Sequence, residues 1–409
     1  MKTKVLIENK NIRGSLSLSG SKSISNRLLI LQALSGQMSP LKNLSNSDDT
    51  LVLQKALSLN SSTIDVGIAG TAMRFLTAFF ATQHKRTTVL SGSERMHNRP
   101  IKVLVEALRD LGAEISYLEK EGFPPLKITG KQLTKNKVQI NGNISSQYIS
   151  ALLLIAASLP NGLRVELIGE ITSIPYINMT LSLLEQVGVA AAFEDQVIEV
   201  QPFKGIKKQS LVVESDWSSA SYFYSIVALS TVGSAIRLSS YKKESLQGDA
   251  VLAKIYEHFG VETTYEANSV VLRKTIESNK ELLKIDLNKA PDIAQTIAVT
   301  CFGLGVSCEL LGLHTLKIKE TDRLEALQIE LTKLGANISV TNTSLHLRTS
   351  SIMNANVSIE TYNDHRMAMA FAPLAMRVPL EILDAGVVTK SYRNFWKDLQ
   401  QIGFQINKV

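Results

Sequence analysis

Two successive patterns of apolar and polar residues in segment 103–128 predict a helix followed by two strands. Apolar residues first recur at helical spacing, and then Ala113-Glu114-Ile115-Ser116-Tyr117 alternates apolar and polar side chains. The first pattern buries one face of a helix, and the second buries one face of a strand. Gly112 lies between them, where a helix commonly ends on a left-handed residue. We therefore predict a helix, a glycine, a strand, a turn and a second strand.

The same succession occurs in four further segments, 181–200, 251–272, 324–347 and 395–409, although the last of them has room for one strand only. The five glycines recur roughly every 70 residues and are Gly112, Gly188, Gly260, Gly335 and Gly403. At this period the chain has room for about six copies. We place a degenerate sixth copy at 51–64, with Asn60 in place of the glycine. Each period also contains another helix, such as 145–158 or 292–303.

This repeat predicts the fold class and the domain organisation. A unit with two helices and about four strands is α/β. Six such units predict two domains of three units each, because a single hydrophobic core rarely serves more than about 300 residues. We expect a discontinuous domain, 1–20 plus 214–409, and an inserted domain, 21–213. The chain would cross between them near Gly20 and at Val213-Glu214-Ser215-Asp216.

Composition limits the classes of function. Hydrophobic residues make up 44% and charged residues 20% of the chain, which are the values of a globular protein. The sequence has no apolar run of about 18 residues, and its first residues resemble no secretory signal, so we expect a cytoplasmic protein without a membrane partner. Cys301 and Cys308 lie in an apolar stretch without metal-ligand spacing, which predicts reduced core thiols. The net charge of +7 would suit a protein that binds nucleic acid. Basic and aromatic residues are not interleaved, however, so we expect no nucleic-acid partner.

The segment Gly20-Ser21-Lys22-Ser23-Ile24-Ser25-Asn26-Arg27 is a candidate anion site. It places hydroxyls and two cations at the start of a predicted helix, where backbone N–H groups and the helix dipole favour negative charge. A nucleotide P-loop is excluded, because Ser21 separates Gly20 from Lys22 and the upstream glycine is missing. For this segment by itself, a structural turn with solvated charges remains the alternative.

Seven short segments resemble the signature segments of the 5-enolpyruvylshikimate-3-phosphate synthase family. They occur in the family's order and span nearly the whole chain. They are residues 20–27, Ala69-Gly70-Thr71-Ala72-Met73-Arg74, Arg95-Met96-His97-Asn98-Arg99-Pro100, Ser145-Ser146-Gln147, Lys319-Glu320-Thr321-Asp322-Arg323, Asp364-His365-Arg366-Met367-Ala368 and Lys390-Ser391-Tyr392. The resemblance implies two domains of βαβαββ units, each an inside-out α/β barrel.

The resemblance also implies an activity. The enolpyruvyl group of phosphoenolpyruvate is transferred to the 5-hydroxyl of shikimate 3-phosphate, through a tetrahedral intermediate and with release of phosphate. This is a step of the shikimate pathway, which leads to chorismate and the aromatic amino acids. The resemblance implies no cofactor and no metal, and we expect a monomer whose partners are these two small molecules. It further implies that glyphosate occupies the phosphoenolpyruvate site.

Residue roles follow from the resemblance. Asp292 would take the hydroxyl proton, Glu320 would protonate the methylene carbon, Lys22 would act on the bridging oxygen, and His365 would stabilise charge. We expect burial to raise the pKa of Glu320 for this task. The implied ligands of shikimate 3-phosphate are Lys22, Ser23, Arg27, Ser145, Ser146, Gln147, Ser173, Tyr176, Asp292 and Lys319. Those of phosphoenolpyruvate are Lys22, Gly70, Arg99, Gln147, Arg323, Arg366 and Lys390.

Each of these residues also has a plain structural reading. Arg323 could be a surface residue paired with Glu320 or Asp322, and Asp292 could be an acid favoured by a helix dipole. Ser145 and Ser146 could be helix caps, Gly70 could form a tight turn, and His365 could be a structural histidine. Because both substrates carry several negative charges, the many cations of the matched segments favour the functional reading. Cations from both halves would repel one another without ligand, so we expect the protein to close when anions bind.

Three residues depart from the family's pattern. Ile68 and Thr315 stand where relatives commonly have Asn, and Arg393 stands where they commonly have Pro.

Three other functions are alternatives to this one. The sister transferase acting on UDP-N-acetylglucosamine uses a cysteine in a mobile loop, and neither cysteine of this sequence lies in such a loop. A nucleic-acid-binding protein would need basic and aromatic residues to interleave. A catalytically inactive relative would not be expected to keep Lys22, Asp292 and Glu320 together.

Overall fold

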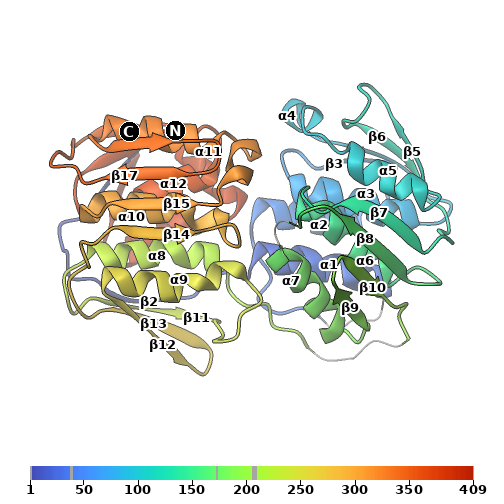
Figure 1. The fold of residues 1–409 in the computed structure, drawn as a ribbon, viewed down its shortest axis with the longest axis horizontal. Helices are drawn as coiled ribbons and strands as arrows, with labels where there is room; N and C mark the ends of the chain where they lie inside the picture. Colours follow the sequence, from blue (N-terminus) through green and yellow to red (C-terminus); the bar gives the residue numbers. More distant parts are fainter. Residues whose placement is uncertain (1, 37–39, 172–173, 205–209, 409) are drawn as a thin grey trace. The chain divides into compact units, whose positions relative to one another are not determined.

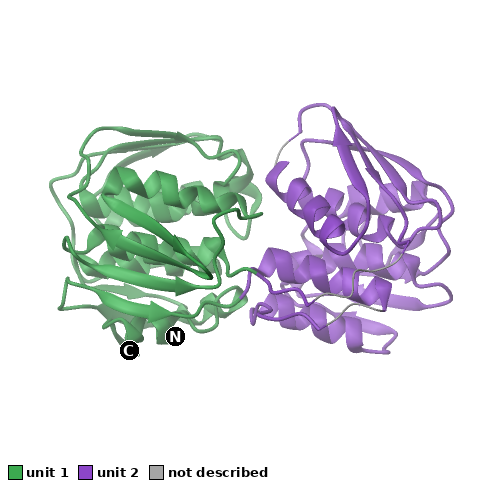
Figure 2. Cartoon of the chain, turned by 90° about the horizontal axis from the view of Figure 1, so that it is seen from below, with its two compact units in different colours: residues 1–19, 214–409 green, residues 20–213 purple. Residues whose placement is uncertain are grey.

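The computed structural model describes residues 2–36, 40–171, 174–204 and 210–408, and the chain divides into two compact units (Figure 1). Unit 1 comprises Met1–Ser19 and Glu214–Val409, and unit 2 comprises Gly20–Val213 (Figure 2). Gly20, which we expected in the discontinuous domain, belongs to unit 2. A Cβ atom at this position would lie 1.9 Å from the carbonyl oxygen of Asn43, so the chain can pass here only with a glycine.

Three four-stranded sheets of unit 1 share one topology. In each sheet, the first two strands pair in parallel and the other pairs are antiparallel. In spatial order the sheets are β14 (Leu283–Asp286), β15 (Cys308–Leu311), β17 (Leu345–Arg348) and β16 (Asn337–Val340); β2 (Arg13–Leu16), β11 (Ala235–Ser239), β13 (Ser269–Lys274) and β12 (Val261–Glu266); and β18 (Val357–Ile359), β19 (Leu380–Ile382), β1 (Thr3–Leu6) and β20 (Gln405–Lys408).

The third of these sheets is completed by the other end of the chain. Segment 395–409 supplies one helix and one strand, as its length predicts, and β1 lies between β19 and β20 in the place of the missing strand. Val5 of β1 is paired with Ile406 of β20 and with Leu380 of β19. The terminal repeat therefore becomes whole only through a pairing between the two ends of the chain.

Unit 2 contains two sheets of the same topology. They are β3 (Thr63–Asp65), β4 (Thr87–Ser91), β6 (Leu126–Thr129) and β5 (Glu114–Tyr117), and β7 (Lys137–Asn141), β8 (Leu163–Ile168), β10 (Val197–Val200) and β9 (Ala191–Glu194). In the described part of this unit, the expected third sheet is reduced to one bridge between Lys42 and Val212. The prediction of a glycine substitute at Asn60 is wrong, because no hairpin follows there. Helix α2 (Asp48–Ser58) ends on an extended Leu59 and leads directly into β3, so the chain needs no left-handed residue.

The five repeat glycines all have positive φ angles, between 74° and 103°, as the sequence predicts. They end the amphipathic helices α5 (Lys102–Asp110), α7 (Ile174–Gln186), α11 (Arg323–Lys333) and α13 (Phe395–Gln401), and a short helical run formed by α9 (Leu252–Ile255) with the 3₁₀ turns η1 (Gly248–Val251) and η2 (Tyr256–Phe259). Such a residue lets the chain reverse into a strand without a Cβ clash.

A second set of helices is buried on nearly all sides and forms the centre of each unit. In unit 1 these are α8 (Trp217–Leu229), α10 (Ala294–Leu304) after the turn η3 (Pro291–Ile293), and α12 (His365–Phe371) continued by η5 (Ala372–Met376); α8 and α12 both contact α10. In unit 2 they are α1 (Lys22–Ser35), α3 (Gly70–Thr82) and α6 (Ser146–Ala156), which contact one another. Helices that are apolar all round belong to a core.

The remaining short elements are α4 (Glu94–His97), η4 (His314–Ile318) and η6 (Ala385–Lys390). Cys301 of α10 and Cys308 of β15 are free and buried, as predicted for core thiols. Among the residues that the structure describes, no helix has the length and apolar character needed to cross a membrane.

Candidate active site

In each unit, several candidate residues lie where the central helices begin. Lys22, Gly70 and Ser146 are the first residues of α1, α3 and α6, Asp292 lies in the turn before α10, and His365 is the first residue of α12. The first N–H groups of a helix have no partner within it and carry positive partial charge. The repeat therefore places polar motifs at several helix N-termini within each unit, a setting that favours anions.

Arg323 is the centre of the cluster in unit 1. Its side chain is 2% exposed. Nε donates to Asp364 Oδ2 at 2.7 Å, Nη1 to Asp292 Oδ1 at 3.0 Å, and Nη2 to Glu320 Oε2 at 2.9 Å. Burial disfavours this cation, but the three carboxylates outweigh burial and hold the pKa of Arg323 above its usual value. The surface reading of Arg323 is therefore wrong. Asp322 instead accepts hydrogen bonds from the backbone at the start of α11.

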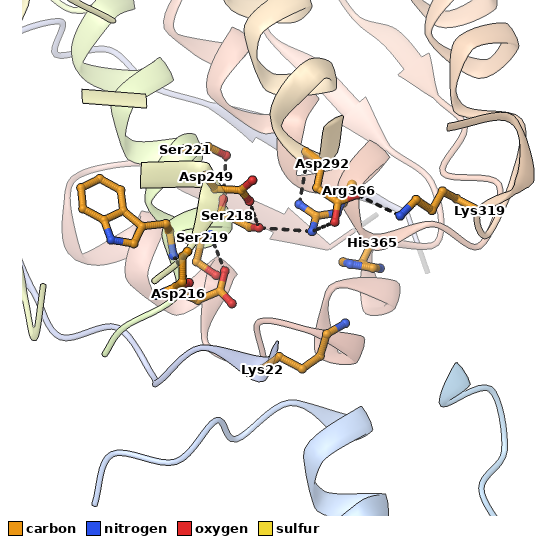
Figure 3. Close-up of polar contacts among 12 residues, drawn as sticks. Lys22, Asp216, Ser218, Ser219, Ser221, Asp249, Asp292, Lys319, His365 and Arg366 are labelled. Carbon is orange, nitrogen blue, oxygen red and sulfur yellow. Dashed lines mark hydrogen bonds and ion pairs between the residues drawn. The ribbon is translucent and has the colours of Figure 1, made fainter. Parts of the chain in front are cut away.

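Asp292 is held by three cations. Its carboxylate lies 3.1 Å from Arg366 Nη2, 3.0 Å from Arg323 Nη1 and 3.5 Å from Lys319 Nζ. Figure 3 shows Arg366 and Lys319 reaching this carboxylate. Burial would raise the pKa of Asp292, but Arg366, Lys319 and Arg323 hold it well below the usual value. Asp292 is thus ionised, as a general base must be, and it makes more contacts than an acid placed only by a helix dipole.

Glu320 contacts two cations. Lys390 Nζ lies 2.5 Å from Oε1, and Arg323 Nη2 lies 2.9 Å from Oε2. Burial favours the neutral acid, but Arg323, Lys390 and His365 together hold the pKa of Glu320 well below its usual value. Our expectation of a raised pKa is therefore wrong for this arrangement, because sequence reasoning considered burial and overlooked the two adjoining cations.

Asp364 belongs to a matched segment, but the sequence analysis assigned it no role. Asp364 is fully buried. Its carboxylate accepts a hydrogen bond from the side chain of Arg323, and it also accepts the backbone N–H of Arg366 at 2.8 Å and thereby caps α12. His365 Nδ1 lies 3.8 Å from Asp364 Oδ1. The position of Asp364 as a cap before a buried helix is a signal that the sequence already contained.

A second missed group extends the cluster toward α8. Arg366 Nη2 donates to Ser218 Oγ at 3.2 Å, and the Ser218 hydroxyl donates to Asp249 (Figure 3). Burial, helped by the nearby charge of Asp292, raises the pKa of Asp249 to about 6, although Arg366 opposes this shift. Asp249 could not be identified from the sequence, because it lies 43 positions before Asp292 in a segment without a recognised motif.

Arg27 is the most buried cation of the unit 2 candidates. It is 3% exposed and donates to Thr180 Oγ1 at 2.8 Å, Ser150 Oγ at 2.9 Å and the carbonyl of Ser23 at 2.9 Å. Its guanidinium also lies over the rings of Phe75 and Tyr176. Among the described residues no carboxylate contacts it, and burial lowers the pKa of Arg27 to about 10. A buried cation with only neutral partners is suited to an anionic ligand.

Lys22 and the serines at the helix starts have more ordinary contacts. Lys22 Nζ donates to Asp49 Oδ2 at 3.2 Å. Ser21, and not Ser23, caps α1, so the Ser23 hydroxyl is not used as a cap. Ser145 caps α6 through the N–H of Gln147, as its structural reading predicts, and Ser146 is buried.

Gly70 provides room for an arginine. A Cβ atom on this glycine would lie 2.4 Å from Nη1 of Arg99 and 2.7 Å from Nη1 of Arg74. Gln147 Nε2 donates to Thr71 Oγ1 at 3.2 Å and so joins α6 to α3 beside this position. Gly70, Arg99 and Gln147 therefore lie close together in unit 2. Ser173 lies outside the described residues.

Comparisons with known proteins agree with this chemistry. The family described as EPSP synthase (3-phosphoshikimate 1-carboxyvinyltransferase) matches residues 7–61 and 56–399. The chain belongs to the EPSP synthase family. A 3-phosphoshikimate 1-carboxyvinyltransferase of Bacteroides fragilis (strain YCH46) is 46% identical over 408 residues, which cover 97% of this chain and 96% of the relative. One from Mannheimia haemolytica is 34% identical over 424 residues, covering 96% and 97%.

Solved structures agree on the fold. An EPSP synthase from Acinetobacter baumannii has a TM-score of 0.81 at 21% identity, with all of both chains covered. The enolpyruvyl transferase NikO from Streptomyces tendae has a TM-score of 0.74 at 13% identity, covering 99% of this chain and 98% of that one. The fold is therefore that of the enolpyruvyl transferases, as the resemblance implied.

The three departures from the EPSP synthase pattern differ in their surroundings. Ile68 is 47% exposed beside the start of α3. Thr315 lies on η4, and its buried Oγ1 has no hydrogen-bond partner among the described residues. Arg393 is exposed after the segment that contains Lys390.

Proposed function

We propose that this chain transfers the enolpyruvyl group of phosphoenolpyruvate to the 5-hydroxyl of shikimate 3-phosphate and releases phosphate, a step of the shikimate pathway. The carrying observation is the network of unit 1, in which Asp292 and Glu320 meet the cations Lys319, Arg323, Arg366 and Lys390. It occurs in a chain whose family is named for this reaction.

Phosphoenolpyruvate would bind by exchanging partners within this network. Its phosphate and carboxylate are alternative anions for Arg323, Arg366 and Lys390, which contact Asp292 and Glu320 in the structure. When Arg323 and Lys390 turn to the ligand, Glu320 loses the cations that lower its pKa, while its burial remains. Substrate binding would thus convert Glu320 from a paired carboxylate into a proton donor.

The addition step needs one base and one acid. Asp292 would remove the proton of the 5-hydroxyl while the oxygen attacks C2 of phosphoenolpyruvate. Glu320 would deliver a proton to C3, which becomes a methyl group. The product is a tetrahedral ketal that still carries phosphate. Arg366 and His365 would stabilise the charge that develops at this centre.

The elimination step reverses the proton movement at C3. The methyl group would return one proton to Glu320, the C2–O bond to phosphate breaks, and the carbon–carbon double bond forms again. Phosphate leaves with the electron pair of that bond. Lys22 would protonate or stabilise the bridging oxygen, and Lys390 would neutralise the leaving phosphate.

The ligands of shikimate 3-phosphate that the family resemblance implies include residues of each unit. In unit 2, Arg27 would supply the positive charge that its neutral partners leave uncompensated. The hydroxyls of Ser23 and Ser146, the helix start at Ser145 and the amide of Gln147 are suited to its phosphate. Tyr176, which already lies over Arg27, would contact the same substrate. Ser173, Lys319 and Asp292 complete the proposed ligand set.

The test is phosphate release with phosphoenolpyruvate and each of two acceptors. We expect release with shikimate 3-phosphate and none with UDP-N-acetylglucosamine, which is the acceptor of the sister transferase. The buried position of Cys301 and Cys308 supports this preference, because that sister enzyme needs a cysteine in a mobile loop. Equal rates with the two acceptors, or the opposite preference, would refute the proposal.

We also propose that the enzyme acts as a monomer in the cytoplasm, without a metal or an organic cofactor. The proposed chemistry consists of proton transfers and charge stabilisation by side chains, so it needs no further group. Light scattering after size exclusion would test the first point, and full activity after dialysis against a chelator would test the second.

A further inference from the structure

Two consecutive residues before Asp364 have left-handed backbones. Tyr362 has a φ of 53° and Asn363 a φ of 54°. This backbone conformation is unfavourable for residues other than glycine. Two such residues in succession keep it only where neighbouring groups hold them in place. The next three residues are Asp364, His365 and Arg366, so the strained turn sets the direction in which α12 begins.

Glu330 of α11 holds this turn. Its side chain is completely buried. Oε1 accepts the hydroxyl of Tyr362 at 2.6 Å, and Oε2 accepts the backbone N–H of Glu360 at 3.2 Å. Lys333 Nζ lies 2.8 Å from each carboxylate oxygen and supplies the opposite charge. A buried carboxylate is costly unless it is fully paired, so these contacts define the position of the turn closely.

The same helix carries Arg323, two turns before Glu330. Residues seven positions apart lie on one face of a helix. Arg323 contacts Asp364 at 2.7 Å, and Glu330 contacts Tyr362 at 2.6 Å. Helix α11 therefore holds segment 360–366 at two points, one on each side of Asn363.

We propose that Glu330 and Tyr362 are positioning residues for the reaction, acting through Asp364 and Arg366. Their hydrogen bond fixes the turn so that Asp364 meets Arg323 and Arg366 meets Asp292. Neither residue belongs to the proposed ligand sets of the substrates. The kinetic part of this inference rests on the proposed function, whereas the backbone part stands without it.

The discriminating variant is Tyr362→Phe, which removes only the hydroxyl. Its matched control is Tyr224→Phe, because Tyr224 is also in unit 1 and its hydroxyl bonds to Thr263 at 2.9 Å, in a contact with no part in the site. Hydrogen exchange is measured on peptides that cover segment 360–371 and the first turn of α11. The KM values for both substrates are measured on the same samples.

Tyr362→Phe should speed exchange in these peptides about tenfold, the scale of a lost hydrogen bond to a charged group. The KM for phosphoenolpyruvate should rise by a similar factor, and that for shikimate 3-phosphate should stay within about twofold. Tyr224→Phe should change neither exchange in these peptides nor the KM values. A Glu330→Gln variant, which keeps an acceptor for Tyr362, should fall between wild type and Glu330→Ala in the KM for phosphoenolpyruvate.

Unchanged exchange in Tyr362→Phe would overturn the positioning role whatever the kinetics show. Faster exchange with an unchanged KM for phosphoenolpyruvate would overturn its connection to the reaction. If the wild-type protein releases no phosphate, the proposed function fails, and the exchange data still decide whether Glu330 and Tyr362 hold the turn.

Discussion

Two buried arginines, one in each unit, are stabilised in opposite ways. Arg323 of unit 1 contacts three carboxylates, which hold its pKa above the usual value. Arg27 of unit 2 contacts two hydroxyls, one carbonyl and two aromatic rings, and burial lowers its pKa to about 10. An anion reaching Arg323 must compete with internal carboxylates, whereas an anion reaching Arg27 meets no such competitor. Ligand binding at Arg323 therefore requires an exchange of partners, whereas Arg27 can accept an anion without displacing a carboxylate.

The strongest test of this comparison is to replace each arginine by methionine. Arg323→Met leaves buried carboxylates without their cation, which typically costs about 3–5 kcal/mol. Urea unfolding followed by tryptophan fluorescence would report it, because Trp217 and Trp396 are the two tryptophans of the chain and both belong to unit 1.

Arg27→Met should have a neutral or stabilising effect on unit 2, because it removes a buried charge without stranding another. Far-UV circular dichroism during thermal unfolding would follow it. Similar losses of stability in both variants would contradict the proposed difference between the two sites.

Asp249 extends the comparison, because it is a carboxyl group of unit 1 whose pKa is raised by burial. Its pKa of about 6 lies above the ordinary 3.8, so folding favours the protonated form. The resulting stability is complete below about pH 3.8 and is lost as the pH rises through 6. Asp249→Asn should therefore be more stable than wild type by about 3 kcal/mol at pH 8 and by roughly half that at pH 5. Urea titrations at the two pH values decide this, and a pH-independent difference would contradict it.

The two carboxylates that exchange partners should matter for turnover. Asp292→Asn and Glu320→Gln should each lower kcat by at least about 10²-fold, the usual scale for a positioned proton-transfer group. Binding of shikimate 3-phosphate, measured by calorimetry, should persist in Glu320→Gln. Glu325→Gln is the matched control, since Glu325 is an exposed acid in the first turn of α11, the helix that begins shortly after Glu320. Wild-type turnover in either site variant would exclude that residue's proposed role.

The smallest effect is expected at Gly70. A methyl group there would press on Nη1 of Arg99 and of Arg74, which are the ends of flexible side chains. We expect Gly70→Ala to raise the KM for phosphoenolpyruvate up to about tenfold, and to weaken glyphosate inhibition by a larger factor. Parallel substrate and inhibitor titrations measure both, and equal losses for the two ligands would show that Gly70 does not line their site.

The sequence predicted the repeat well because its signals are local. Alternation, helical spacing and the left-handed glycines each depend on residues close together in the chain, and all five glycines have the expected backbone. The degenerate sixth copy was misread at Asn60, because whether a hairpin follows a helix depends on which strands are available for pairing. The placement of β1 between β19 and β20 is likewise a pairing between the two ends of the chain.

What the sequence by itself determined was the α/β repeat and, through its motifs, the family and the residues worth examining. What only the tertiary structure decided was their electrostatic state. Glu320 was expected to carry a raised pKa, yet Lys390, 70 positions away, and Arg323 reverse the shift. No sequence motif predicted the role of Asp249 or the contact between Glu330 and Tyr362. Charge interactions and burial depend on distances in space, and residues far apart in the sequence acquire those distances only when the chain folds.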